Sequence, residues 1–176
     1  MAEPDRAHAE TVITSLLLMG FVFAGVLLAR EGPHFDNTVH GERLFIYAFF
    51  GGGIAGFLGW TRLKDVTPVL SLSQPMRQLW LATALAALAS ATLASYVNRS
   101  FATLTEHSRV APIDQVQEGK GTRWHVVVRA SNGALERYLI TEDAAAQLKS
   151  AKTVRMRYAR GALGFDYIAV FEPVRP

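Results

Sequence analysis

Three long apolar runs constrain this chain of 176 residues more than any other feature. They cover residues 11–29, 44–60 and 79–97, and none of them contains a charged residue. At about 1.5 Å per residue, each run would form a helix of roughly 26–29 Å, close to the thickness of a bilayer's hydrocarbon core. The sequence therefore predicts three transmembrane helices in a membrane domain at residues 11–97. The acidic segment ahead of the first run argues against a cleaved secretory signal.

Lys and Arg residues flank the runs unevenly, and such residues are more frequent in cytoplasmic loops. One side of the predicted membrane domain carries Arg6, Arg62, Lys64 and Arg77, and the other carries Arg30, Arg43 and Arg99. This bias places an N-terminal tail, residues 1–10, and the second loop in the cytoplasm. The first loop and the C-terminal part would then lie outside.

Small residues recur at helical spacing in the second and third runs. In the second run one helix face would carry Gly52, Ala55, Gly56 and Gly59. A matching face in the third run would carry Ala82, Ala86, Ser90 and Ala94. Small residues at four-residue spacing let two helix backbones approach closely within lipid. We therefore expect these two helices to dock through their small faces, with Leu81, Leu85 and Leu88 turned toward lipid.

A glycine-rich membrane helix can also be a hinge or part of a conduction path. Transport sites usually contain charged side chains within the membrane or helices broken by proline. The three runs contain neither feature. A transporter or lipid-handling accessory subunit that moves around residues 51–59 is therefore our second hypothesis.

The first loop contains four side chains of the kind that bind divalent metals, namely His34, Asp36, His40 and Glu42. Their spacing matches no metal motif with a physical rationale. We expect a polar loop with incidental histidines, and neither a metal nor another cofactor.

The C-terminal part changes from a helical to an alternating pattern, after a linker predicted at residues 98–108. Within a β-domain at residues 109–176, strands are predicted at 110–116, 122–130, 135–140, 152–159 and 165–171, with a helix at 142–149. Asn132-Gly133 is a hairpin signal, Thr141 is a helix cap, and Pro112 favours an edge position for the first strand. This order favours a five-stranded OB-like barrel, with an SH3-like barrel as the alternative. The predicted fold class is an α+β membrane protein.

Arginines on the outward positions of two predicted strands could form a face for an anionic ligand, around His125. They are Arg123, Arg129, Arg155 and Arg157. Binding of single-stranded nucleic acid would also need exposed aromatic rings for stacking. Trp124 and Tyr158 instead fall on the core side of their strands, Tyr158 together with Val154 and Met156, so we expect no nucleic acid. Anionic lipid or a cell-wall polymer fits this face better.

No catalytic set emerges from the sequence. His107 and His125 have no motif-supported nucleophile or acid partner, and Glu136 is expected at the surface. The glycine pair at residues 161 and 164 is similar to a phosphate-binding loop, but no helix follows it, so a turn between strands is expected. A membrane-tethered enzyme is therefore only our third hypothesis.

Two segments, YVNRSF after the third run and VRMRYARGALGFDYI near the C-terminus, carry a resemblance to a group of proteins. The chain resembles small uncharacterised bacterial inner-membrane proteins with a C-terminal exoplasmic β-domain, over about its last 80 residues. In those proteins an Asn-Arg pair closes the last helix and an acidic residue follows shortly after, where this chain has Ala102. The resemblance implies location in a bacterial inner membrane, with a periplasmic domain, and no established activity.

Our leading hypothesis is a non-enzymatic integral membrane protein that anchors an exoplasmic β-module. The module would bind or help to assemble envelope proteins. The expected partners are membrane lipid and either another membrane or envelope protein or a second copy of the chain.

Overall fold

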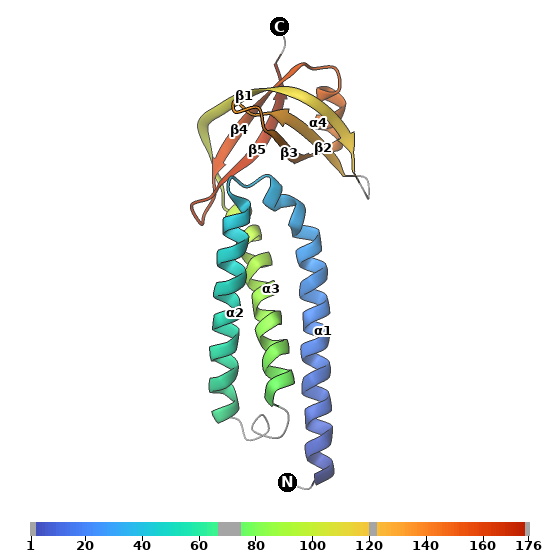
Figure 1. Ribbon diagram of the computed structural model, residues 1–176, viewed down its shortest axis with the longest axis vertical. Helices are drawn as coiled ribbons and strands as arrows, with labels where there is room; N and C mark the ends of the chain where they lie inside the picture. The colour runs from blue at the N-terminus through green and yellow to red at the C-terminus, as the bar shows by residue number, and fades with distance from the viewer. Residues whose placement is uncertain (1–2, 67–74, 120–122, 175–176) are drawn as a thin grey trace. The chain divides into compact units, whose positions relative to one another are not determined.

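The computed structural model describes residues 3–66, 75–119 and 123–174, and the chain divides into two compact units. The helical unit comprises Met1–Gly32 and Glu42–Ser95, and the β-unit comprises Pro33–Gly41 and Tyr96–Pro176. Figure 1 shows their elements, three long helices in one unit and a curled sheet with a short helix in the other. The connection between the first two helices thus belongs to the β-unit, together with the C-terminal strands.

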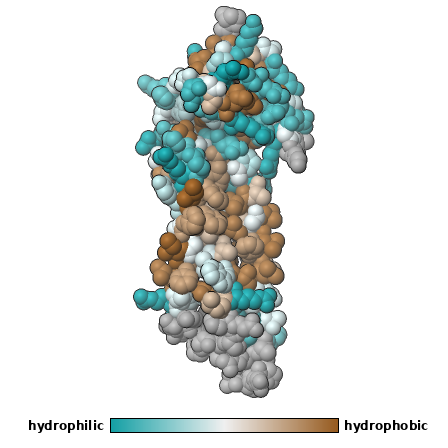
Figure 2. Space-filling model, in the orientation of Figure 1, coloured by the Kyte–Doolittle hydropathy of each residue, from teal (hydrophilic) through white to brown (hydrophobic). Residues whose placement is uncertain are grey.

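Three long helices confirm the predicted runs: α1 (Glu3–Asp36), α2 (Gly41–Val66) and α3 (Pro75–Ser100). Each is long and apolar enough to cross a membrane, which points to a multi-pass membrane protein. Figure 2 shows hydrophobic side chains over the visible surface of the helices and mostly hydrophilic ones over the β-unit. A helix with apolar side chains on its outer surface is typical of lipid rather than of water.

The prediction of a long polar first loop was wrong. Helix α1 continues through Pro33 to Asp36, so only four residues separate it from α2. Its last carbonyls have partners, because the Thr38 hydroxyl donates to the His34 carbonyl (3.1 Å) and the Thr38 N–H to the Phe35 carbonyl (3.1 Å). Capping of this kind lets the helix end within the β-unit at low cost.

Helices α2 and α3 pack closely at two of the predicted glycines. A Cβ atom on Gly52 would collide with the Ser90 side chain, and one on Gly56 would lie 2.5 Å from the Cβ of Ala86. The Ala82 carbonyl oxygen would also be only 3.2 Å from a Cβ on Gly56. Neither glycine could carry a side chain without moving α3.

Other members of the predicted small face lie elsewhere. Ala55 is exposed, and a Cβ on Gly59 would meet nothing within 4 Å, whereas Gly53 faces Ala87. At about 100° per residue, Ala55 lies about 100° from Gly56 around the helix, which turns it away from the contact. Gly59 is seven residues after Gly52 and only about 20° from it around the helix. Its position along α2, and not its face, therefore leaves Gly59 without a neighbour on α3.

Helix α3 also contacts α1, which corrects the lipid-facing prediction for Leu85. A Cβ on Gly20 would lie 3.1 Å from Cδ2 of Leu85, so this leucine packs on α1. The Gln78 amide donates to the Thr14 hydroxyl (3.4 Å) at one end of the same contact. Two neighbours for α3 leave a narrower exposed side than the sequence pattern suggested.

The β-unit contains the predicted order of three strands, a helix and two strands. They are β1 (Thr103–Glu118), β2 (Trp124–Arg129), β3 (Leu135–Ile140), α4 (Glu142–Leu148), β4 (Thr153–Arg160) and β5 (Asp166–Pro173). All pairs are antiparallel, in the order β3-β2-β1-β4-β5, and the sheet curls into a half-barrel. The hairpin at Gly133 (φ 82°) and the turn ending at Gly164 (φ 84°) confirm two predicted turns.

Strand β1 is longer than predicted and lies at the centre of the sheet, so two predictions were wrong. It begins at Thr103, which pairs with Arg160, and therefore includes most of the expected linker. It pairs with β4 up to Pro112 and with β2 from Ile113 onward, so Pro112 is not in an edge strand. Successive N–H groups of a strand point to opposite neighbours. Because the Ile113 N–H donates to the Lys152 carbonyl next to β4, an N–H at position 112 would point toward β2. The pairing of β1 with β2 begins only at Ile113, so the missing N–H of Pro112 costs no hydrogen bond between the strands.

The core of the β-unit lies on the concave face of the sheet, beneath α4. Val126, Val154, Met156 and Leu148 are fully buried in it, and Tyr158 is nearly so. The inward prediction for Val154, Met156 and Tyr158 is confirmed, and Trp124 packs against the same cluster. This core holds the edges of the half-barrel in place.

Candidate functional site

The half-barrel is open between its two edge strands, β3 and β5, and a short segment of the α1–α2 connection bridges them. The Ile168 N–H donates to the Asn37 carbonyl (2.8 Å), and the Val39 N–H donates to the Asp166 carbonyl (2.8 Å). The Asn37 side chain reaches the other edge, where it accepts from the Leu139 N–H and donates to the Leu139 carbonyl, both at 2.7 Å. Asn37 thus joins β5 through its backbone and β3 through its amide.

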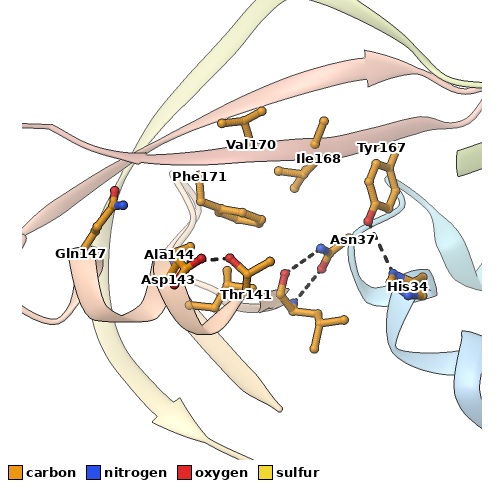
Figure 3. A pocket seen from close by; sticks show the side chains of 13 residues that line it. His34, Asn37, Thr141, Asp143, Ala144, Gln147, Tyr167, Ile168, Val170 and Phe171 are labelled. Atoms are coloured by element: carbon orange, nitrogen blue, oxygen red, sulfur yellow. Dashed lines mark hydrogen bonds between the residues drawn. The ribbon is translucent and has the colours of Figure 1, made fainter. Parts of the chain in front are cut away.

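Beside this bridge the opening forms a pocket of about 340 Å³, which we call the gap pocket (Figure 3). Its walls combine apolar side chains of both edges, Ile140, Ile168 and Phe171, with polar groups at the rim. The rim groups are His34, Asn37, Thr141, Asp143, Gln147 and Tyr167. Pockets that bind small ligands begin near 300 Å³, a volume that can also take one large side chain of a protein partner.

Helix α4 supplies one wall of the gap pocket. Thr141 caps the helix as predicted, because its hydroxyl accepts from the Ala144 N–H (3.3 Å). Ala145 and Leu148 are buried in the core, which turns Asp143, Ala144 and Gln147 toward the pocket. The core therefore fixes which side of α4 the pocket presents.

The rim is tied to the end of α1 by one further contact. Tyr167 lies opposite Thr38 in an isolated antiparallel bridge, and its hydroxyl is 3.5 Å from Nδ1 of His34. Of the four metal-type side chains of the first loop, His34 thus lies at the rim of the gap pocket, whereas Asp36 lines another pocket. Among the described residues no group of three or more His, Asp or Glu side chains could hold a metal ion.

A polar cluster of Arg109, Glu136 and Tyr138 lies near Phe171. The ring centroids of Phe171 and Tyr138 are 6.1 Å apart. Glu136 accepts from Arg109 (3.0 Å) and from the Tyr138 hydroxyl (2.9 Å). Burial, and then the neighbouring Glu136 carboxylate, raise the pKa of Tyr138 well above its ordinary value. Glu136 is thus a carboxylate with 34% of its side chain exposed and two hydrogen-bond partners, which the sequence did not indicate.

The structure separates the four predicted arginines. Arg129 pairs with Asp114 (2.7 Å) and Arg157 with Glu172 (3.5 Å), so both have carboxylate partners. Arg155 lies across from Glu172 in the register of β4 and β5. Arg123 precedes β2, whereas Arg129 ends it, so the length of that strand separates them. The four residues do not form one compact anion site.

His125 lies in a different place, at an open pocket of about 570 Å³ lined also by Asp36, Glu118, Arg123 and Arg137. Its Nδ1 is 3.1 Å from an Arg137 guanidinium nitrogen, which can only donate, so Nδ1 accepts and Nε2 carries the proton. Burial, and then the positive charge of Arg137, lower the pKa of His125. Opposite charges are mixed here, so the pocket is not a simple anion site.

The residues that the sequence failed to assign are two buried asparagines, Asn37 and Asn98. Asn98 is fully buried at the end of α3. It accepts from the Leu163 N–H (3.1 Å) and donates to the Phe165 carbonyl (2.9 Å), so it holds the turn between β4 and β5. The Asn-Arg pair of the resemblance marked this position but gave it no partner.

Comparisons with known proteins do not add an identity to this geometry. No protein-family model matches the chain, and no curated protein or solved structure matches it. Function must therefore be argued from the gap pocket and the helices themselves.

Proposed function

We propose that this chain is a multi-pass membrane protein whose β-unit binds a segment of another membrane or envelope protein in the gap pocket. The three apolar helices support insertion in a membrane. The uneven Lys and Arg residues favour a cytoplasmic N-terminus and an exoplasmic β-unit, and the resemblance favours a bacterial inner membrane.

The division of the chain supports a three-span topology. With three spans, the α1–α2 connection and everything after α3 must lie on the same side of the membrane. The structure has these two stretches, Pro33–Gly41 and Tyr96–Pro176, within one compact unit. A topology in which either α2 or α3 failed to cross would put these two stretches on opposite sides of the membrane.

The order of the elements favours an OB-like interpretation of the β-unit over an SH3-like one. A helix separates β3 from β4, and the first strand pairs with both β2 and β4. Small barrels of that class are partly open and bind extended polymers. A shared fold does not establish a shared function, so the proposed function rests on the gap pocket.

The main support for the proposal is the opening between the edge strands β3 and β5, which Asn37 fills at one end. Asn37 shows that an extended segment can satisfy β5 and β3 together. Farther along β5, Ala169, Val170 and Phe171 line the gap pocket instead. An extended partner segment with one large apolar side chain fits such a site, because buried anchors and edge pairing together give affinity.

The experiment combines photo-crosslinking with a variant that fills the pocket. A benzoylphenylalanine at Ala169, an exposed pocket residue, should crosslink a protein partner in native membranes. Ala144→Trp should abolish that adduct because it occupies the pocket. Ala146→Trp is the matched control, since Ala146 is exposed on the same helix and does not line the pocket.

An adduct that survives Ala144→Trp, or no adduct from Ala169, would overturn the proposal. Loss of the adduct in both tryptophan variants would point to damage to α4 instead of to occupation of the pocket. Far-ultraviolet circular dichroism of both variants would detect that damage independently.

A further inference from the structure

The end of the β-unit that contains the last turn of α3 exposes four large apolar or aromatic side chains. The exposed fractions are 51% for Tyr96, 68% for Phe101, 58% for Leu104 and 46% for Leu163. Hydrogen bonds join the elements that carry them. We call these four residues the α3-end surface. An exposed group of this kind usually marks a binding surface.

Hydrogen bonds fix the turn between β4 and β5 beside Asn98. Besides the two bonds of the Asn98 side chain, the Ala162 N–H donates to the Asn98 carbonyl (3.3 Å). Gly161 has no room for a Cβ, because Asn98 fills that space. Leu163 is therefore held at the level of Asn98 along α3 and cannot move away from the helix end independently.

Strand pairing brings Leu104 to the same turn. Thr103 pairs with Arg160 and Leu104 with Ala159, at the end of β4 that leads into the turn. Phe101 connects α3 to β1, and its N–H donates to the Val97 carbonyl (3.2 Å). The α3-end surface thus combines the last turn of α3, the start of β1 and the tip of the β4–β5 turn.

The residues of α3 show where the membrane boundary would fall. Arg77 and Arg99 flank the apolar part of the helix, with exposed Trp80 and Tyr96 just inside them. The distance between these arginines is about 33 Å at about 1.5 Å per residue, near the roughly 30 Å of a hydrocarbon core. Aromatic residues and arginines are enriched at that boundary. Asn98, next to Arg99, then lies at the boundary itself.

We propose that the α3-end surface is a lipid-binding surface, with Phe101, Leu104 and Leu163 inserted at the boundary between headgroups and acyl chains. This inference rests on the membrane insertion proposed above. Apolar side chains of interfacial segments typically enter this boundary by about 5–10 Å. The β4–β5 turn therefore makes the β-unit a peripheral lipid-binding module in addition to its attachment through α3.

Charge at the rim favours lipid over a protein partner for this surface. Arg99 lies over the Tyr96 ring, 5.9 Å from its centroid. Arg160 is 64% exposed beside the turn, where Asp166 lies 3.4 Å from its guanidinium. Such cations can reach lipid phosphates while their aliphatic stems cover apolar surface. The α3-end surface also continues directly from α3, a helix apolar enough to span a membrane. This continuity favours lipid as well.

The absence of cysteine from the sequence makes a site-specific test direct. Leu163→Cys and Phe101→Cys would each carry a spin label in the full chain, reconstituted in phosphatidylcholine and phosphatidylglycerol vesicles. Leu135→Cys is the matched control, because Leu135 is 59% exposed but lies at the start of β3. Phe50→Cys, 63% exposed in the middle of α2, reports on membrane insertion. The measured quantity is accessibility to oxygen relative to a water-soluble nickel complex.

We expect the ratio at Leu163 and Phe101 to exceed that at Leu135 severalfold and to approach that at Phe50. Aqueous ratios at both Leu163 and Phe101, with a lipid ratio at Phe50, would overturn the inference and leave the proposed membrane topology intact. An aqueous ratio at Phe50 would overturn membrane insertion itself and the inference with it. Two labelled positions keep the test decisive if one variant fails to fold.

Discussion

Distant segments are joined by glycines in the helical unit and by buried asparagines in the β-unit. Helices α2 and α3 touch where Gly52 and Gly56 leave the backbone uncovered. In the β-unit, Asn37 ties the α1–α2 connection to β3, and Asn98 ties the end of α3 to the β4–β5 turn. Each side chain accepts from one backbone N–H and donates to one backbone carbonyl. The first contact depends on shape, and the second on paired hydrogen bonds.

The difference follows from where backbone groups already have partners. Within a helix each interior N–H and C=O is bonded to the same helix, so a neighbouring helix needs only a surface that fits. Edges of an open sheet and tight turns leave backbone groups without partners, and burial makes them costly. An asparagine amide satisfies a donor and an acceptor at once.

Gly52→Leu should produce the largest effect. A side chain at position 52 would collide with Ser90 and approach the Ala86 carbonyl oxygen, and that backbone atom cannot move without the helix. We expect a loss beyond the roughly 1–3 kcal/mol typical of overpacked cores. Thermal unfolding of the detergent-solubilised chain, followed by circular dichroism, measures it.

Gly59→Leu is the matched control, because a Cβ there meets nothing within 4 Å. It should leave the melting temperature almost unchanged. Equal stability of the Gly52→Leu and Gly59→Leu proteins would show that α2 and α3 do not pack tightly. The hypothesis of a moving glycine-rich helix would then become the stronger one.

Asn98→Ala should destabilise the β-unit less. It leaves the Leu163 N–H without its partner, whereas the Phe165 carbonyl still accepts from the Gly161 N–H (3.2 Å). A buried unsatisfied group costs about 1–3 kcal/mol. We expect faster hydrogen exchange of the Leu163 amide and a lower midpoint in urea. Asn132→Ala is the control, since the Asn132 side chain bonds only within its own exposed hairpin. Similar losses in both variants would contradict a special role for the buried asparagine.

Much of the fold could be predicted because its signals are local. Apolar runs defined the three helices, and Asn132-Gly133, Thr141 and the alternation at Val154, Met156 and Tyr158 defined a hairpin, a cap and a core side. The ends of elements were less predictable. Thr103–Ser108 is a strand because of β4, about fifty residues farther along the chain, and no local pattern contains that partner.

The candidate site was not predictable, because it consists of contacts between distant segments. Asn37 bonds to Leu139 and Asn98 to Phe165, and an asparagine at or just after the end of a helix gives no indication of either partner. Glu136 had the same difficulty, since its partner Arg109 lies on another strand. The small faces were half predictable: helical spacing identified Gly52 and Gly56, but the direction of α3, which excludes Ala55 and Gly59, is a tertiary property.

Acidification should change the stability of the chain least. It tests whether the burial of His125 in the β-unit lowers stability at acidic pH. Burial, and then Arg137, lower the pKa of His125, whereas a histidine in an unfolded chain titrates near 6.5. As the pH falls through that value, the unfolded chain takes up a proton that folded His125 does not. Stability should therefore fall with pH between the unfolded value and the lower folded one, and it should be complete above that window.

Urea unfolding of the whole chain at about pH 7.5 and about pH 5 brackets the free histidine value. His125→Gln should remove the part of the pH dependence that belongs to this side chain. His107→Gln should leave it in place, because His107 is exposed on β1. Identical pH dependence in the wild-type chain and the His125→Gln protein would show that His125 is protonated as readily folded as unfolded. That result would mean that the His125 imidazole stays hydrated in the folded chain, contrary to its position between Gly119 and Arg137.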